Sequence, residues 1–273
     1  DTELQRRWTL TLEAMAKEDV DMLVLQGFDR VYGGVQKYLT DMSVTLYPHA
    51  ALFSKEGIAV FAHGDLGFQA FPDYVAYRNV YVNEAYPCLP STPYGDTWIP
   101  ARMVELIKKH GCKKVGFVGM FYIFAGTYKY LTENLPDVEF VNFANQMDEI
   151  KAVKSQWELE EYQRIVNLHD DMIAAVPTIL RVGRTEREVA NQIRNLAFDL
   201  GCPEVNVILG TDKLHPVLNP YLYMNNARIE AGDCFQLLIE LAGPGGLWAE
   251  CGRMYCMGEI NPRMQKAFDD QIK

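Results

Sequence analysis

The stretch LLIELAGPGGLWAECGRMYCMGE, residues 237–259, reads as two β-strands joined by a glycine-rich turn. Glu240 and Glu250 lie on either side of this turn in an otherwise apolar hairpin. If the turn centres on Gly245, antiparallel pairing places the two glutamates directly opposite each other, with their Cβ atoms ~5 Å apart. A register slip of one residue would instead place them on opposite faces of the hairpin.

Two opposed carboxylates repel each other, so the predicted pairing requires compensation. A bound metal ion, a shared proton or a nearby cation such as Arg253 could provide it. In the alternative interpretation, one glutamate faces solvent and the other forms a local ion pair. The residues alone leave these possibilities open.

The region before this hairpin predicts two long helices. Apolar residues between residues 156 and 180 recur at helical spacing, and Pro177 should kink this helix or begin its last turn. Thr185 and Glu188 form a predicted capping box at the start of a second helix, which ends at Gly201. Strand patterns follow, so residues 151–273 predict an α+β domain.

The first 150 residues alternate between helix and strand patterns. A helical pattern precedes the short apolar run VDMLVLQG, and residues 50–64 read as a hairpin that turns at Lys55–Gly57. An amphipathic helix that ends at Gly111 is followed by another strand. These patterns predict a separate α/β domain over residues 1–150, with a boundary between residues 145 and 155.

Composition limits the classes of partner. The chain has 273 residues and a net charge of −10 without a long Lys/Arg cluster, which argues against nucleic acid as a partner. No apolar run reaches ~18 residues, so we expect no membrane span. None of the 6 cysteines forms a C-x-x-C pair, which is typical of reduced thiols in a cytoplasmic protein.

His215 is the leading candidate for an acid–base group. It lies in the polar, proline-containing connection KLHPVLNPYLYMNNARIEAGD, residues 213–233, close to a strand end. The ordinary pKa of histidine, ~6.5, suits proton transfer near neutral pH. His169 is a weaker candidate, on a polar stretch of the first long helix.

Five segments together resemble the creatinase, aminopeptidase P and prolidase family, which has the pita-bread fold. Residues 6–41 resemble the start of the creatinase-type N-terminal domain, and the helical segments 149–172 and 182–201 resemble the first helices of the catalytic domain. Segments 227–241 and 245–253 resemble the strand pair on which the family's metal site begins. The resemblance implies a creatinase-type α/β domain followed by an α+β pita-bread domain that is truncated at its C-terminal side. The remaining ligands of the family's site, a His and two Glu, would follow the end of this chain, which need not be active alone.

Two departures from the family pattern concern the metal site. Metal-dependent members carry Asp where Glu240 and Glu250 stand, and a Thr where Gly252 precedes Arg253. The longer Glu side chains should displace a two-metal centre beyond its tight distance tolerance. Creatinase uses no metal, and its catalytic His lies in a stretch similar to the one around His215. The resemblance therefore implies His215 as a proton shuttle.

The leading hypothesis is a creatinase-like hydrolase that cleaves a C–N bond in a small amidine or amide without any cofactor. His215 would protonate the leaving nitrogen, while Glu240 and Glu250 would hold a cationic substrate or be neutralised by Arg253. The alternative is a metal-dependent Xaa-Pro aminopeptidase or dipeptidase, in which Glu240 and Glu250 bind two divalent ions such as Mn²⁺. A third possibility is a catalytically silent binding module.

The resemblance also implies a homodimer, in which the N-terminal domain of one subunit reaches the site of the other. Arg30, Tyr32 and Tyr38 follow a predicted strand in the N-terminal domain and are candidate substrate contacts, as is Arg253. The expected partners are a small molecule or dipeptide substrate and a second copy of the chain, without nucleic acid or membrane.

Overall fold

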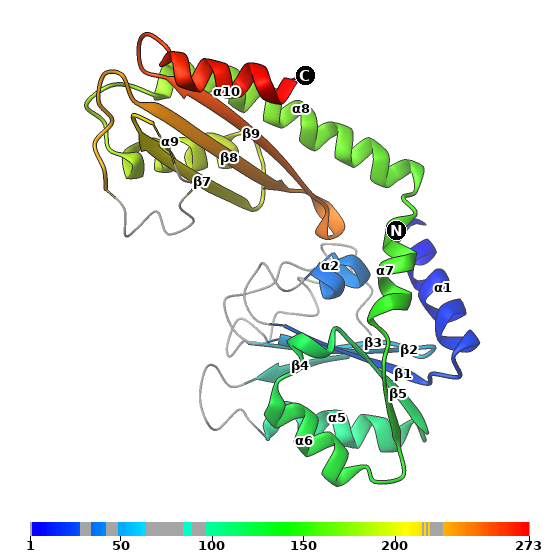
Figure 1. Cartoon of the computed structure of the whole chain (residues 1–273). Helices are drawn as coiled ribbons and strands as arrows, with labels where there is room; N and C mark the ends of the chain where they lie inside the picture. Colours follow the sequence, from blue (N-terminus) through cyan, green and yellow to red (C-terminus); the bar gives the residue numbers. More distant parts are fainter. Residues whose placement is uncertain are drawn as a thin grey trace. The chain divides into compact units, whose positions relative to one another are not determined.

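The protein is a mixed α/β structure, here a computed structural model of the chain (Figure 1). The contacts within the chain divide it into two compact units, Asp1–Ser155 and Gln156–Lys273. Across the described ranges, no helix has the length and apolar character that crossing a membrane requires. The structure describes residues 2–27, 34–41, 49–63, 84–88, 97–214, 216, 218 and 226–272.

The first unit is built on a mixed sheet of 6 strands in the order β4-β3-β2-β1-β5-β6. The central strand β1 is antiparallel to β2 and parallel to β5, and all its residues are buried, as its apolar run requires. The predicted hairpin turn is confirmed, because β2 ends at Ser54 and β3 begins at Gly57. The strands are β1 Met22–Gly27, β2 His49–Ser54, β3 Gly57–His63, β4 Glu84–Cys88, β5 Lys114–Val118 and β6 Glu139–Asn142.

Helices cover both faces of this sheet (Figure 1). Side chains of α1, α2 and α7 contribute to one apolar core, and those of α5 and α6 contribute to a second core. The predicted end of α5 is confirmed, since Gly111 follows it with a left-handed φ of 64°. These helices are α1 Thr2–Lys17, α2 Gly34–Thr40, α5 Trp98–Lys109, α6 Ala125–Asn134 and α7 Ala144–Ala152, with a short 3₁₀ turn at Met120–Tyr122.

The second unit begins with the two predicted long helices. Pro177 is expected either to kink α8 or to begin its last turn. It lies in the last turn, because α8 ends at Ile179. The predicted capping box opens α9: the backbone N–H of Glu188 donates to Thr185 Oγ1 at 3.2 Å, and the N–H of Thr185 donates to Glu188 Oε2 at 2.7 Å. The elements are α8 Gln156–Ile179, α9 Glu186–Asp199, β7 Val205–Asp212, β8 Cys234–Ala242, β9 Trp248–Cys256 and α10 Pro262–Ile272.

Strands β7, β8 and β9 form an antiparallel sheet in that order, with α8 and α9 against one face (Figure 1). Along β8, every second side chain is fully buried against these helices and forms the core of the unit. The intervening side chains therefore lie on the opposite face. We call this the open face. The positions of β8 that belong to this helix-side core are Phe235, Leu237, Ile239 and Leu241.

Candidate functional site

The register of the β8–β9 hairpin places Glu240 directly opposite Glu250, as the turn predicted. A short 3₁₀ turn, Pro244–Gly246, joins the strands, and Gly245 within it has a φ of 64°. This left-handed conformation is accessible to glycine at little cost, so the turn fixes the register.

Both glutamates lie on the open face, because their chain neighbours Ile239 and Cys251 pair with each other on the helix side. On the other side of β8, Asn206 of β7 lies directly opposite Glu240. Its Nδ2 donates to Glu240 Oε2 at 2.8 Å. An amide and two carboxylates thus form one row across the three strands, which we call the Asn–Glu–Glu row. Glu240 is half-buried and Glu250 is exposed, so water can reach the row.

Sequence reasoning did not identify Asn206. Its strand is separated from β8 by residues 213–233, and a connection of that length does not fix a register. The short turn between β8 and β9 does fix it, which is why the glutamate pair was predictable and its amide partner was not.

Arg253 does not neutralise the glutamates, which corrects the expectation. It pairs with Leu237 of the helix-side core, so it lies on the face opposite Glu250. Its guanidinium donates to the carbonyl of Gly252 at 2.7 Å. A role for Arg253 in substrate binding stays a prediction.

His169 lies in the interior of the second unit, with 3% of its surface exposed. Its Nδ1 is 3.0 Å from the carbonyl oxygen of Ile165, and its Nε2 is 3.1 Å from that of Ile239. A neutral ring can donate from only one of these nitrogens. The Nε2–H tautomer donates to the Ile239 carbonyl and so connects α8 to β8 beside Glu240, whereas the Nδ1–H tautomer donates within α8.

A second close contact holds β8 on the other side of Glu240. A Cβ atom at Gly243, which follows β8, would lie only 2.5 Å from Cδ1 of Ile165, so glycine there allows the chain to approach α8 without displacing that side chain. Helix α8 therefore contacts the chain both before and after Glu240.

The other predicted site residues are not brought to this row by the described structure. His215, Arg30 and Tyr32 lie outside the described residues. Tyr38 is 3% exposed in α2, with the guanidinium carbon of Arg7 4.2 Å from the centre of its ring. Its role as a substrate contact stays a prediction.

The donor chemistry of the Asn–Glu–Glu row fits a hard divalent cation. Carboxylate oxygens are ligands that Mn²⁺ and Mg²⁺ accept, and a cation between Glu240 and Glu250 would offset their repulsion. Within the described part of the chain, no group of three or more His, Cys, Asp and Glu side chains could hold a metal. The row contributes two carboxylates, one fewer than such a group requires.

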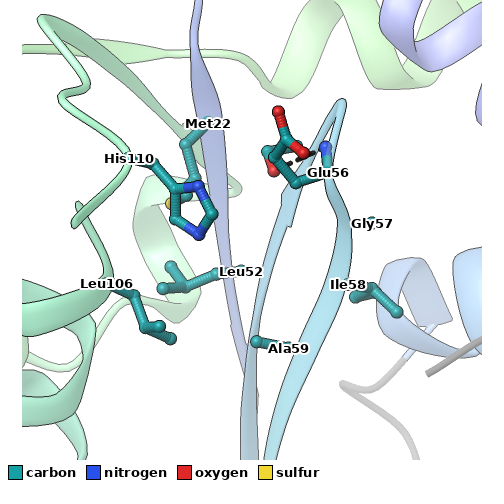
Figure 2. Close-up of a pocket in the computed structure, with 9 residues that line it drawn as sticks. Met22, Leu52, Glu56, Gly57, Ile58, Ala59, Leu106 and His110 are labelled. Carbon is teal, nitrogen blue, oxygen red and sulfur yellow. Dashed lines mark hydrogen bonds between the residues drawn. The ribbon is translucent and has the colours of Figure 1, made fainter. Parts of the chain in front are cut away.

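The first unit contains a small pocket (Figure 2). It lies between the β2–β3 hairpin and the end of α5, and its volume is about 50 Å³. That volume admits a few water molecules but no dipeptide. Glu56 and His110 are its ionisable lining residues, and the backbone N–H of Glu56 donates to Ser54 Oγ at 3.2 Å.

Comparisons with known proteins identify the fold. No protein-family model matches the sequence, and no curated protein matches it. Among solved structures, X-Pro aminopeptidase from Thermotoga maritima matches with a TM-score of 0.75 and 13% identity, over 96% of this chain and 68% of that one. The Xaa-Pro dipeptidase from Bacillus anthracis matches with a TM-score of 0.70 and 16% identity, over 97% of this chain and 68% of that one. The prolidase from Pyrococcus horikoshii matches with a TM-score of 0.70 and 16% identity, again over 97% and 68% of the two chains.

These matches contradict the prediction of a site without a cofactor. The matched structures are Xaa-Pro peptidases, the metal-dependent members of the family that the sequence resembles. The hypothesis of a creatinase-like, metal-independent enzyme is therefore not supported. At these identities the likeness establishes the fold. The chain therefore has the fold of the prolidases, Xaa-Pro dipeptidases and aminopeptidases.

Proposed function

We propose that the chain forms part of a metal-dependent Xaa-Pro peptidase, in which Glu240 and Glu250 are oxygen ligands of divalent cations. The observation that carries this proposal is the direct opposition of the two carboxylates on the open face of the sheet. Like charges placed opposite each other destabilise a sheet unless a cation lies between them. The fold that the chain shares with Xaa-Pro peptidases supports a catalytic role for this cation.

Each residue of the row has a distinct role in this proposal. When bound, a divalent cation would act as a Lewis acid that polarises the carbonyl of the scissile peptide bond. Glu240 and Glu250 hold the cation, while Asn206 orients the Glu240 carboxylate through its 2.8 Å hydrogen bond. His215 delivers a proton to the leaving nitrogen, as the family resemblance implies.

The substrate in this proposal is a dipeptide or a short peptide with proline in the second position. The first unit corresponds to the creatinase-type N-terminal domain and the second to the pita-bread domain. A cytoplasmic homodimer, with Arg30, Tyr32 and Tyr38 as substrate contacts, completes the proposal.

The test combines metal binding with hydrolysis. The protein would be stripped with a chelator and titrated with Mn²⁺ by calorimetry, and Xaa-Pro dipeptide cleavage would be followed with and without Mn²⁺. We expect Glu240→Gln and Glu250→Gln to weaken Mn²⁺ binding on the order of tenfold or more and to abolish stimulated cleavage. Glu259→Gln is the matched control, because Glu259 is exposed beyond the end of β9.

Two results would contradict the proposal. One is unchanged Mn²⁺ affinity in both glutamate variants. The other is dipeptide cleavage that a chelator does not reduce. Stoichiometric Mn²⁺ binding without cleavage of any Xaa-Pro dipeptide would retain the ligand assignment and reject the peptidase activity.

A further inference from the structure

Two cysteines face each other at the end of the β8–β9 ladder that is remote from the Asn–Glu–Glu row. Cys234 pairs directly with Cys256, and their Sγ atoms are 3.7 Å apart. Both are free thiols in the structure. Directly opposed residues on antiparallel strands have Cα atoms ~4.5 to 5.5 Å apart, within the range that disulfides span. A bond length of ~2.05 Å is therefore within reach of side-chain rotation alone.

The other cysteines of the second unit are not placed to form a disulfide with Cys234 or Cys256. Cys251 pairs with Ile239 on the helix side of the sheet, so it lies on the face opposite Cys256. Cys202 is buried and donates from Sγ to the carbonyl of Glu204 at 3.0 Å. The geometry thus selects one pair.

We propose that Cys234 and Cys256 are a redox-sensitive pair that a peroxide oxidises to a cross-strand disulfide. The proposal is independent of the peptidase function, because it rests on the register and the sulfur positions alone.

The two thiols have different accessibility, which sets the order of the steps. Cys234 is 1% exposed, whereas Cys256 is half-buried, so a peroxide reaches Cys256 first. Burial, together with the adjacent Cys256 thiol and the charges of Asp233 and Asp212, raises the pKa of the Cys234 thiol to about 11. The buried, protonated Cys234 is therefore not the thiol oxidised first, and it acts in the second step, in which its proton leaves with the hydroxyl.

The chemistry balances with hydrogen peroxide as the oxidant. The Cys256 sulfur attacks one peroxide oxygen, the O–O bond breaks, and a sulfenic acid and one water form. The Cys234 sulfur then attacks the Cys256 sulfur, the S–O bond breaks, and the hydroxyl leaves with the thiol proton as a second water. Two thiols are oxidised by two electrons in total, and one peroxide is reduced.

The disulfide would join β8 to β9 where the chain leaves the sheet toward α10. It closes a loop over residues 234–256 and so restricts the unfolded chain, which raises the melting temperature of the second unit. Reduction with dithiothreitol should reverse this increase.

The experiment follows the thiols by mass spectrometry. The protein would be treated with hydrogen peroxide, blocked with N-ethylmaleimide and measured intact, and we expect two fewer blocked thiols. Trypsin cleaves after Arg228, Arg253 and Arg263, so non-reducing digestion should link peptide 229–253 to peptide 254–263. Because the first peptide contains both Cys234 and Cys251, the digestion is repeated on the Cys251→Ser variant.

Matched variants separate the outcomes. Cys251→Ser should keep the link and the rise in melting temperature, while Cys234→Ser and Cys256→Ser should lose both. Cys256 is half-buried, so its variant serves even if Cys234→Ser fails to fold. Retention of all six thiols, a link through Cys251, or a disulfide between two chains would overturn the proposal.

Discussion

The second unit contains two pairs of carboxylates in contrasting environments. Glu186 and Asp233 are 0% and 5% exposed, whereas Glu240 is half-buried and Glu250 is exposed. A neutral donor serves each pair. Thr211 donates from its backbone N–H to Glu186 Oε1 at 2.7 Å and from Oγ1 to Asp233 Oδ2 at 3.3 Å, as Asn206 does for Glu240.

Solvent access separates the two pairs. Burial raises the pKa of the Glu186 carboxyl and the charge of Asp233 raises it further, against the opposing effect of the Thr211 N–H. Oε2 of Glu186 is buried and has no hydrogen-bond partner among the described residues. The buried pair is therefore a structural feature with a cost in stability, while the open pair is accessible to a ligand.

Removing the Glu186 carboxyl should have the largest effect. Glu186→Ala leaves the Thr211 N–H without its acceptor, which costs about 1 to 3 kcal/mol in the free energy of unfolding. Urea unfolding would measure this loss, with Glu250→Ala as the exposed counterpart. Equal losses in the two variants would remove the distinction between the pairs.

The pH dependence of stability should distinguish the pairs next. The folded-state pKa of Glu186 lies above the ordinary value of 4.5, so the native state binds more protons than the unfolded chain between these two values. The favourable contribution of Glu186 to the free energy of unfolding is therefore fully present below pH 4.5. It is lost as pH rises through the folded-state pKa, at up to about 1.4 kcal/mol per pH unit.

Glu186→Gln should remove this fall in stability, because the amide oxygen can still accept from Thr211 without ionising. Unfolding free energies across a pH series would be compared for the two proteins. Parallel curves would show that Glu186 does not titrate as its burial requires.

Asn206→Asp should sharpen the comparison on the open face. The substitution replaces a hydrogen bond to Glu240 with a third carboxylate in the row, at a cost of roughly 1 to 2 kcal/mol at low ionic strength. Added salt should recover part of this loss, because the row is accessible to water. Asn206→Ala loses only the hydrogen bond, so a salt-independent difference between the two variants would exclude charge repulsion.

The smallest expected effect is a gain in stability. Glu250→Gln removes one of the two opposed charges and should stabilise the metal-free protein by about 0.2 to 1 kcal/mol. Thermal unfolding at low salt would measure this gain against the Glu259→Gln control. A loss of stability in Glu250→Gln would mean that the two charges do not repel each other in the folded protein.

Local signals were sufficient to predict much of the fold. The glycine turn fixed the opposition of Glu240 and Glu250, the capping box at Thr185 began α9, and the β2–β3 turn followed residue 54. Each of these depends on residues that are close in sequence, where spacing determines geometry.

The features that sequence reasoning missed depend on distant segments. Asn206 reaches Glu240 across a long connection, and His169 contacts a carbonyl 70 residues away. The burial of Glu186 similarly depends on how α9 packs against the sheet. In these cases tertiary packing decides the environment of the side chain, and a helical or strand pattern carries no information about it.

The contacts of α8 with β8 on either side of Glu240 also have a consequence for motion. His169 lies against the Ile239 carbonyl and Ile165 lies against Gly243, whereas β9 is an edge strand of the described sheet. Amide protons of β8 around Glu240 should therefore exchange with solvent more slowly than those of β9 around Glu250. We therefore expect Glu240 to be the less mobile member of the pair, so that an adjustment of the distance between the two carboxylates falls mainly to Glu250 on the edge strand.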